Sequence, residues 1–146
     1  MNLRRVALAA VVAWVVYMAL GFVVHGVLLK DTYLQYASVM RPEADQNGLL
    51  PIAFGGSLVG FFAFAYAYAK GYEGGSGVQE GMRFGVLIGI MLCVFSVSYE
   101  YMMWPIGRRL LAAWIVDYII EFAIYGMLVG SLYRPLASPA RRTGAV

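Results

Sequence analysis

The sequence predicts an all-α protein, a transmembrane four-helix bundle, from three observations. Apolar residues make up 62% of the chain and charged residues 13%, and the mean hydropathy is +0.72, outside the range of soluble domains. Four apolar runs are each long enough to cross about 30 Å of hydrocarbon. The 146 residues leave no room for a separate soluble domain, so residues 1–146 are expected to form a single membrane domain in the lipid bilayer.

The four apolar runs define the expected helices. They extend over about Val6 to Leu29, Leu49 to Ala69, Met82 to Trp104 and Leu110 to Tyr133. The first run is too long for a signal peptide and no A-x-A cleavage site closes it, so we expect it to stay as a span. Pro42 and Gly48 are expected to break any helix in the first loop. The second loop, 70–81, reads as a glycine-rich turn, and 134–146 as a flexible cytoplasmic tail.

The arginines and lysines beside the spans predict the orientation. Seven lie on the side of the two termini and the second loop: Arg4, Arg5, Lys70, Arg83, Arg134, Arg141 and Arg142. Four lie on the opposite side: Lys30, Arg41, Arg108 and Arg109. Because basic residues are retained on the cytoplasmic side, both termini are expected in the cytoplasm of a multi-pass protein of the bacterial inner membrane.

Several function classes are disfavoured by what the chain contains. The single cysteine, Cys93, permits no disulfide, CxxC pair or cysteine-rich metal site. The second loop has no GxxxxGK[ST] motif, so its glycines indicate a linker rather than a phosphate-binding loop. The basic residues flank spans, which gives no case for nucleic acid. With no recognisable nucleophile and base, we expect a protein that is not an enzyme and uses no cofactor.

Four ionisable residues lie inside the expected spans and are the strongest functional lead. They are His25, Glu100, Asp117 and Glu121. An ionised group at the centre of a span costs roughly 2.5 to 3.5 kcal/mol, so each needs a compensating partner. All four fall in the outer half of their spans, and the inner half has no ionisable residue. This asymmetry argues against an ion-conducting path and predicts a polar pocket open to the outer side.

Asp117 and Glu121 are the deepest pair and lie one turn apart on one helix face. Two carboxylates so close disfavour ionisation of both, so one is expected to carry a proton. His25, a bound cation, a shared proton or a water chain could compensate the other. Two carboxylates and an imidazole also suit a divalent transition metal, but the ExxH pair of di-metal bundles is absent, which leaves a metal an open question.

A structural reading of the same residues is also available. Arg108 and Arg109 lie between the third and fourth spans, where either could reach Glu100 and Asp117. Under this reading Glu100 forms a structural ion pair, and His25 is a hydrogen-bonded residue of the interface. Asp117 and Glu121 have no basic residue in their own span, so a functional or partner-binding role is favoured for these two acids.

Small residues recur at helical spacing and predict close helix packing. Gly81, Gly85 and Gly89 form a tandem GxxxG motif, and Gly56 and Gly60 repeat the spacing in the second span. Within lipid, helix association depends on close packing and hydrogen bonds, which small residues permit. We expect these glycines to bring neighbouring helices together.

Four short segments of the chain suggest a relationship to known proteins. They are HGVLLKDTY (His25 to Tyr33), AKGYEG (Ala69 to Gly74), EGMRFGVLIG (Glu80 to Gly89) and YRP (Tyr133 to Pro135). Together they resemble a family of small uncharacterised bacterial four-span integral membrane proteins. The resemblance covers nearly the whole chain and implies the fold and location. It implies no activity, because the family has none established.

Two classes of function follow from these patterns. In the first, which we favour from the sequence, the protein is a non-catalytic accessory or interaction subunit. It packs through glycine-rich helices against a larger membrane complex or forms a homo-oligomer. In the second, it is a transporter or sensor component that binds a proton, cation or small ligand from the outer side. Asp117 and Glu121 would then be the acceptors and His25 a titratable partner.

Overall fold

The computed structural model describes residues 1–133, and this part of the chain is helical without strands. Four of its helical segments are long and apolar enough to cross a membrane: Leu3–Leu28, Glu43–Gly71, Gly77–Met103 and Arg108–Leu132. The predicted all-α four-helix fold class is confirmed. The predicted tail, 134–146, lies outside the described residues.

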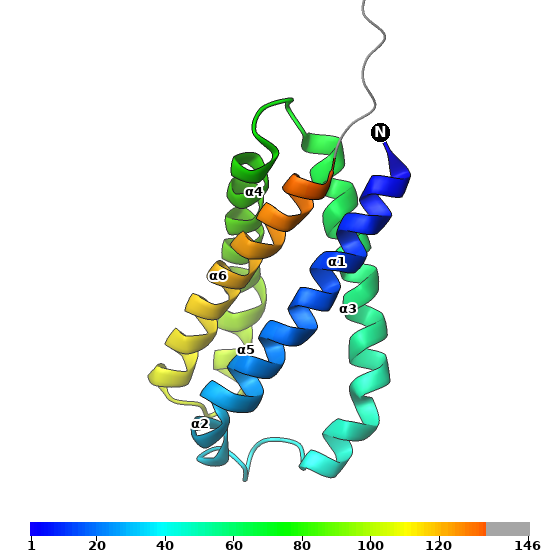
Figure 1. Cartoon of the computed structure of the whole chain (residues 1–146). Helices are drawn as coiled ribbons and strands as arrows, with labels where there is room; N and C mark the ends of the chain where they lie inside the picture. Colours follow the sequence, from blue (N-terminus) through cyan, green and yellow to red (C-terminus); the bar gives the residue numbers. More distant parts are fainter. Residues whose placement is uncertain (134–146) are drawn as a thin grey trace, which may run out of the picture.

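The four long segments are assembled from eight elements. These are α1 (Leu3–Gly21), a π-helical turn (Phe22–Leu28), α2 (Lys30–Leu34), α3 (Glu43–Gly71), α4 (Gly77–Leu92), a second π-helical turn (Cys93–Val97), α5 (Ser98–Met103) and α6 (Arg108–Leu132). Figure 1 shows that the start of α1 and the end of α6 lie at one end of the bundle, here named the terminus end. The opposite end, with α2, α5 and the start of α6, is named the His25 end.

All four long helices begin earlier than predicted, and the difference is largest for α3. Helix α3 starts at Glu43, so Gly48 lies inside the helix and does not break it. The fixed backbone of Pro42 precedes the first turn, and the carboxylates of Glu43 and Asp45 interact favourably with the amide dipoles there. A glycine inside a helix costs only about 1 kcal/mol relative to alanine. These starting signals therefore outweigh Gly48.

The second loop is shorter than predicted, because α4 starts at Gly77 and leaves only 72–76 between the helices. Gly74 has a φ of 95°, a left-handed conformation that favours glycine. The Glu80 carboxylate accepts a hydrogen bond from the Gly75 N–H at 2.6 Å. This contact holds the turn against the first turn of α4.

Helices α4 and α6 pack along a seam of glycines with their backbones in contact. A Cβ added to Gly81 would overlap the carbonyl oxygen of Gly126, and one added to Gly85 would overlap that of Phe122. At Gly89 the nearest atom would be the Tyr118 carbonyl oxygen, 2.9 Å away. These obstacles are backbone atoms, which cannot rotate aside. The seam thus requires glycine at these positions.

Gly56 and Gly60 behave differently from the glycines of α4. A Cβ added to either would meet no atom within 4 Å. The prediction that these two glycines bring helices together is therefore wrong within the described chain. The reason is the course of α3, which packs mainly on α1 and diverges from α4.

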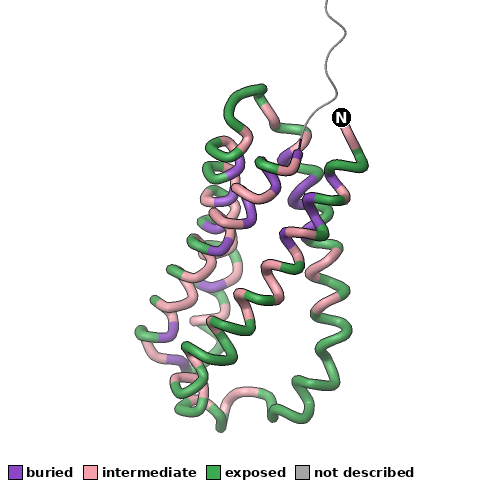
Figure 2. The backbone as a smooth tube through the Cα atoms, viewed as in Figure 1, coloured by how far each residue is buried: buried purple, intermediate pink, exposed green. Residues whose placement is uncertain are grey.

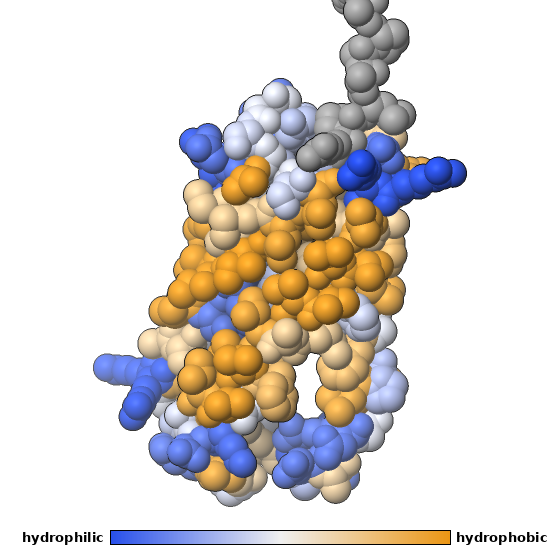
Figure 3. Space-filling view, in the orientation of Figure 1, coloured by the Kyte–Doolittle hydropathy of each residue, from blue (hydrophilic) through white to orange (hydrophobic). Residues whose placement is uncertain are grey.

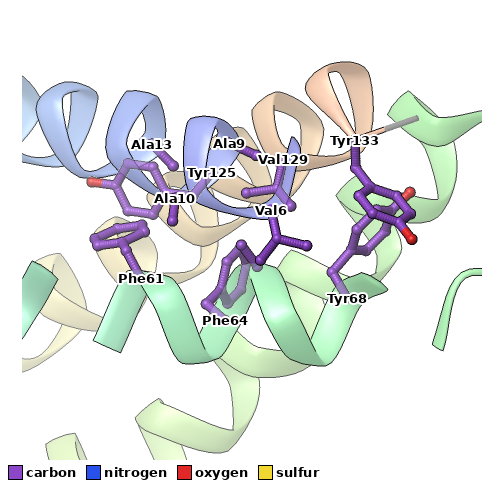
Figure 4. Packing of buried hydrophobic residues seen from close by; sticks show 11 residues of the cluster. Val6, Ala9, Ala10, Ala13, Phe61, Phe64, Tyr68, Tyr125, Val129 and Tyr133 are labelled. Atoms are coloured by element: carbon purple, nitrogen blue, oxygen red, sulfur yellow. The ribbon is translucent and has the colours of Figure 1, made fainter. Parts of the chain in front are cut away.

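The hydrophobic core lies toward the terminus end, where α1, α3 and α6 meet. Figure 4 shows most of its members, which are Val6, Ala9, Ala10, Ala13, Phe61, Phe64, Ala65, Tyr68, Tyr125, Val129 and Tyr133. Four small or β-branched residues of α1 face the aromatic rings of α3 and α6. The rings of Phe61 and Tyr125 meet edge to face, with centroids 5.1 Å apart, the geometry that aromatic pairs favour.

Toward the His25 end the bundle opens. Figure 2 shows few buried residues there, and every residue of 43–53 is exposed. In Figure 3 an opening separates α1 from α3 at this end. Of the four long segments, α3 has the smallest buried share, 17% of its most apolar stretch. The fold is thus tightly packed at the terminus end and open beside the ionisable residues.

Candidate functional site

His25 lies on the π-helical turn that follows α1 and contacts two other elements. Its Nδ1 is 2.7 Å from the hydroxyl of Tyr33 in α2. Its Nε2 is 3.4 Å from Oδ2 of Asp117 in α6. Turns of this kind occur frequently at functional sites. The structure thus brings His25, one of the partners that the sequence left open, to Asp117.

Trp114 determines the direction of the hydrogen bonds around His25. The indole N–H of Trp114 donates to the Tyr33 hydroxyl oxygen at 2.8 Å, and an indole nitrogen can only donate. With one acceptor site of the hydroxyl occupied in this way, we infer that Tyr33 gives its own proton to Nδ1 of His25. Neutral His25 then carries its proton on Nε2, directed at the Asp117 carboxylate. A chain of donors runs from Trp114 to Asp117.

Tyr33 keeps its proton over the range in which histidines titrate. Burial raises the pKa of the Tyr33 phenol. The hydrogen bond from Trp114 acts in the opposite direction and is weaker, while the charges of Asp117 and Glu100 add to the increase. Tyr33 is therefore a stable hydrogen-bond donor to His25.

Asp117 and His25 differ in their access to the surface. The Asp117 side chain is 9% exposed, whereas that of His25 is 43% exposed. The imidazole therefore lies between the buried carboxylate and the surface.

Glu121 lies one turn further along α6 and is the most deeply placed acid. The residue is 8% exposed. Its Oε2 accepts a hydrogen bond from the Tyr125 hydroxyl at 2.5 Å, whereas Oε1 is buried without a hydrogen-bond partner in the described chain. Leaving such an oxygen unpaired costs about 1 to 3 kcal/mol, and more when it is charged. A proton or a bound donor at Oε1 would remove this cost.

Glu100 is compensated differently from the prediction. The Ser96 hydroxyl donates to Oε1 of Glu100 at 2.9 Å. The expected ion pair with Arg108 or Arg109 is not formed among residues 1–133, and both arginines are exposed. They occupy the first turn of α6, where long cationic side chains extend toward the polar side. No arginine in the described ranges neutralises the three acids.

The sequence patterns missed Tyr33 and Trp114 as members of the site. Their contact joins residues 81 positions apart. Each side chain is ordinary in its own segment, so only the fold brings them together. A sequence signal that could have found this contact is a tryptophan, whose indole only donates hydrogen bonds, at the same end of the bundle as a titratable residue.

Metal binding finds no support in this geometry. Within the part of the chain that the structure describes, no three His, Cys, Asp or Glu side chains are placed to hold a metal ion. His25 and Asp117 are in contact with each other, and this pair would supply two metal ligands at most.

The ionisable cluster interrupts the apolar surface of the molecule. In Figure 3 a small hydrophilic area lies within the apolar band between α1 and α6. His25, Asp117 and Glu121 come from these two segments. The fold and the cluster together define the class: a four-helix protein with membrane-length helices and a polar site in one half of the bundle.

Comparison with protein families, with curated proteins and with solved structures finds no match to this chain. The resemblance to a bacterial four-span family is thus untested.

Replacing Tyr33 by phenylalanine is expected to release His25 from a single tautomer. The variant removes the hydroxyl and with it two hydrogen bonds, the one with His25 Nδ1 and the one from Trp114, at a cost of about 1 kcal/mol each. His25 is the single histidine of the chain, so nitrogen NMR of the imidazole reports on it alone. Tyr36→Phe is the control, because the Tyr36 hydroxyl contacts Gly107 instead. Identical imidazole spectra in wild type and Tyr33→Phe would contradict the assignment.

Proposed function

We propose that the protein binds a proton or a small cation reversibly at Glu121 and Asp117, as a component of a transporter or a sensor. One observation carries the proposal: Glu121 is buried at span depth with one carboxylate oxygen unpaired. A carboxylate in this condition is unstable without a proton or a cation. The unpaired oxygen of Glu121 therefore lacks a partner that a bound proton or cation would provide.

The charge balance of the cluster supports a positively charged ligand. Glu100, Asp117 and Glu121 are three acids against one imidazole, and the described chain contains no lysine or arginine paired with them. Interactions between charges are stronger in the low-dielectric interior than in water. A proton or a cation is thus favoured over an anion at this site.

The orientation of the site follows from the basic residues in the sequence. In the sequence, seven basic residues flank the span ends on the side of the two termini and the second loop, and four flank the opposite span ends, so we propose that the His25 end faces outward and both termini are cytoplasmic. The inner membrane is the proposed location. The aromatic core at the terminus end supports a site that is reached from one side only.

A second candidate function is the accessory subunit favoured by the sequence. The observation that supports it is the exposed first half of α3, where residues 43–53 have no buried member. A span with so little contact inside the chain is available for a partner helix in a larger complex or a homo-oligomer. The residues of α3 do not indicate whether the partner is a larger complex or a second copy of the chain.

One experiment separates the two functions. The double variant Asp117→Asn and Glu121→Gln is compared with wild type for thermal stability and oligomeric state from pH 5 to pH 8. Glu43→Gln and Asp45→Asn, both exposed, form the control pair. We expect a pH-dependent shift in stability in wild type and in the control, and none in the double variant, with assembly unchanged. Loss of assembly without any pH response in wild type would refute the proton site and support the accessory subunit.

A further inference from the structure

An apolar groove runs between α3 and α4, where the two helices diverge. Its volume is about 520 Å³. Gly60, Ala63 and Ala67 line the groove on α3, and Ile88 and Leu92 line it on α4. The three residues of α3 are exposed, so the groove is open along this helix. In a bilayer, a groove with such walls is in contact with hydrocarbon chains.

The groove has the length of one membrane leaflet. Ser57, the middle residue of α3, lines one end, and Ala67 lies ten positions further toward the terminus end. At a rise of 1.5 Å per residue this distance is about 15 Å, which is half of the roughly 30 Å hydrocarbon core of a bilayer. The groove therefore runs from the middle of the span toward the surface at the terminus end.

The hydroxyl of Ser57, at the inner end of the groove, already has its hydrogen-bond partners within the protein. It accepts a hydrogen bond from the Trp14 indole N–H at 3.0 Å and donates one to the Phe54 carbonyl oxygen at 3.0 Å. A molecule in the groove therefore needs no polar atom to satisfy Ser57 at this depth. The end of a hydrocarbon chain meets this condition.

At the terminus end the groove adjoins a second cavity, which has charged walls. Phe84 lines both cavities, and its ring packs on Phe64 and Tyr68 of α3, with centroids 4.9 and 5.7 Å away. The second cavity has a volume of about 200 Å³ and is also lined by Tyr68, Gly71, Glu73, Glu80 and Arg83. The two cavities therefore form one site, apolar within the span and charged at its surface.

The charged walls carry both signs. Arg83 is exposed and forms no ion pair among residues 1–133, and a guanidinium is well suited to pair with a phosphate. Glu73 is exposed, and Glu80 accepts a hydrogen bond from the Gly75 N–H. These two carboxylates attract an ammonium group and repel a second negative charge. The charges are thus complementary to a head that contains a phosphate and an amine.

We propose that this site binds a zwitterionic phospholipid of the leaflet at the terminus end. The phosphate lies at Arg83, the amine lies beside Glu73 and Glu80, and one acyl chain lies in the groove between α3 and α4. The length of the groove and the charges at its outer end select this occupant. The inference goes beyond the proposed function, because the lipid site does not include the acidic cluster of the His25 end.

The first test maps the acyl chain by photo-cross-linking of the full chain in nanodiscs. Two forms of phosphatidylethanolamine are used, one with a diazirine at the end of an acyl chain and one with a diazirine near the acyl carbonyl. We expect the terminal probe to label Gly60 and Leu92, and the carbonyl-side probe to label Ala67 and Phe84. Uniform labelling of the lipid-facing residues by both probes would overturn the proposal.

The second test measures lipid retention by native mass spectrometry of matched variants. Gly60 lines the groove and Gly55 lies outside it, and a Cβ at either meets nothing within 4 Å. Gly60→Leu should abolish the retention of phosphatidylethanolamine, whereas Gly55→Leu should not change it. Arg83→Gln should weaken retention at least about threefold, the effect of an exposed ion pair. Arg109→Gln, at the other end of the bundle, is its control.

The head group is tested with lipids of identical acyl chains. Phosphatidylethanolamine should be retained about threefold more strongly than phosphatidylglycerol, which has the phosphate but no amine, and Glu73→Gln should reduce this preference. Equal retention of the two lipids, equal retention by Gly60→Leu and Gly55→Leu, or a dimer that Gly60→Leu dissociates would overturn the proposal. The pH response that depends on Asp117 and Glu121 is measured separately, so either proposal can fail without the other.

Discussion

Replacing Gly85 by leucine is expected to abolish the contact between α4 and α6 and to unfold the bundle. Gly85 is buried at the middle of the seam, and its missing side chain would overlap the Phe122 carbonyl. This overlap can be removed only if the two helices move apart along their whole contact. We expect a loss of more than about 3 kcal/mol, at the upper end of the effects of overpacking. Thermal denaturation in detergent, followed by circular dichroism, measures it.

The control for this prediction is a glycine with open space in front of it. Gly60→Leu introduces the same side chain at a position where a Cβ meets nothing within 4 Å. We expect its stability to remain within about 0.5 kcal/mol of wild type, as for most surface changes. Equal losses in Gly85→Leu and Gly60→Leu would show that the seam between α4 and α6 is not as described.

Much of the fold could be predicted from the sequence, because hydrophobicity alone selects membrane-length helices. The four apolar runs correspond to the four long helices. The ends of these helices are harder to predict from the sequence. The sequence predicts that Gly48 breaks any helix in the first loop, but Gly48 lies within α3. Local signals at Pro42 and Glu43 decide that boundary. The low helix propensity of one glycine changes the free energy of helix formation less than the signals at the start of this 29-residue helix do.

Helix pairing was beyond the reach of spacing patterns. Gly56 and Gly60 have the same spacing as Gly81 and Gly85, yet only the latter pair meets another backbone. A helix pattern shows which residues share a face but not which helix that face meets. The partner glycines of the seam on α6, such as Gly126, were not singled out for the same reason.

The acidic site was predicted in part. His25, Glu100, Asp117 and Glu121 were selected by the cost of ionisable groups in apolar spans, and the structure brings His25 to Asp117. The predicted ion pair of Glu100 with Arg108 or Arg109 was wrong, because proximity in sequence does not determine where a long side chain points. Contacts such as Trp114 with Tyr33 depend on the whole fold.

Replacing Glu121 by glutamine is expected to have the largest effect on ligand binding. The amide keeps an oxygen that accepts the Tyr125 hydroxyl but cannot release or take up a proton. We expect proton binding at this position to be lost and cation binding to weaken at least about tenfold, since one charged hydrogen bond is worth about that factor. Stability should not fall, because a neutral side chain replaces a buried ionisable one. Isothermal titration with a simple amine measures the affinity.

Tyr125→Phe provides the matched comparison for this variant. It removes the single hydrogen bond that Glu121 receives and leaves both carboxylate oxygens unpaired, at a cost of about 1 to 3 kcal/mol. A stable Glu121→Gln and a destabilised Tyr125→Phe are the expected pair of results. The opposite order would show that Glu121 is held as a structural carboxylate.

The central claim is that Glu121 carries a proton in the ligand-free protein and gives it up when a cation binds. Infrared difference spectroscopy of the membrane-embedded protein tests this directly through the carbonyl band of a protonated carboxylic acid. We predict such a band near neutral pH in wild type, its loss on addition of a cationic amine, and its absence in Glu121→Gln. A band that is unchanged in Glu121→Gln, or no band in wild type, would contradict the account.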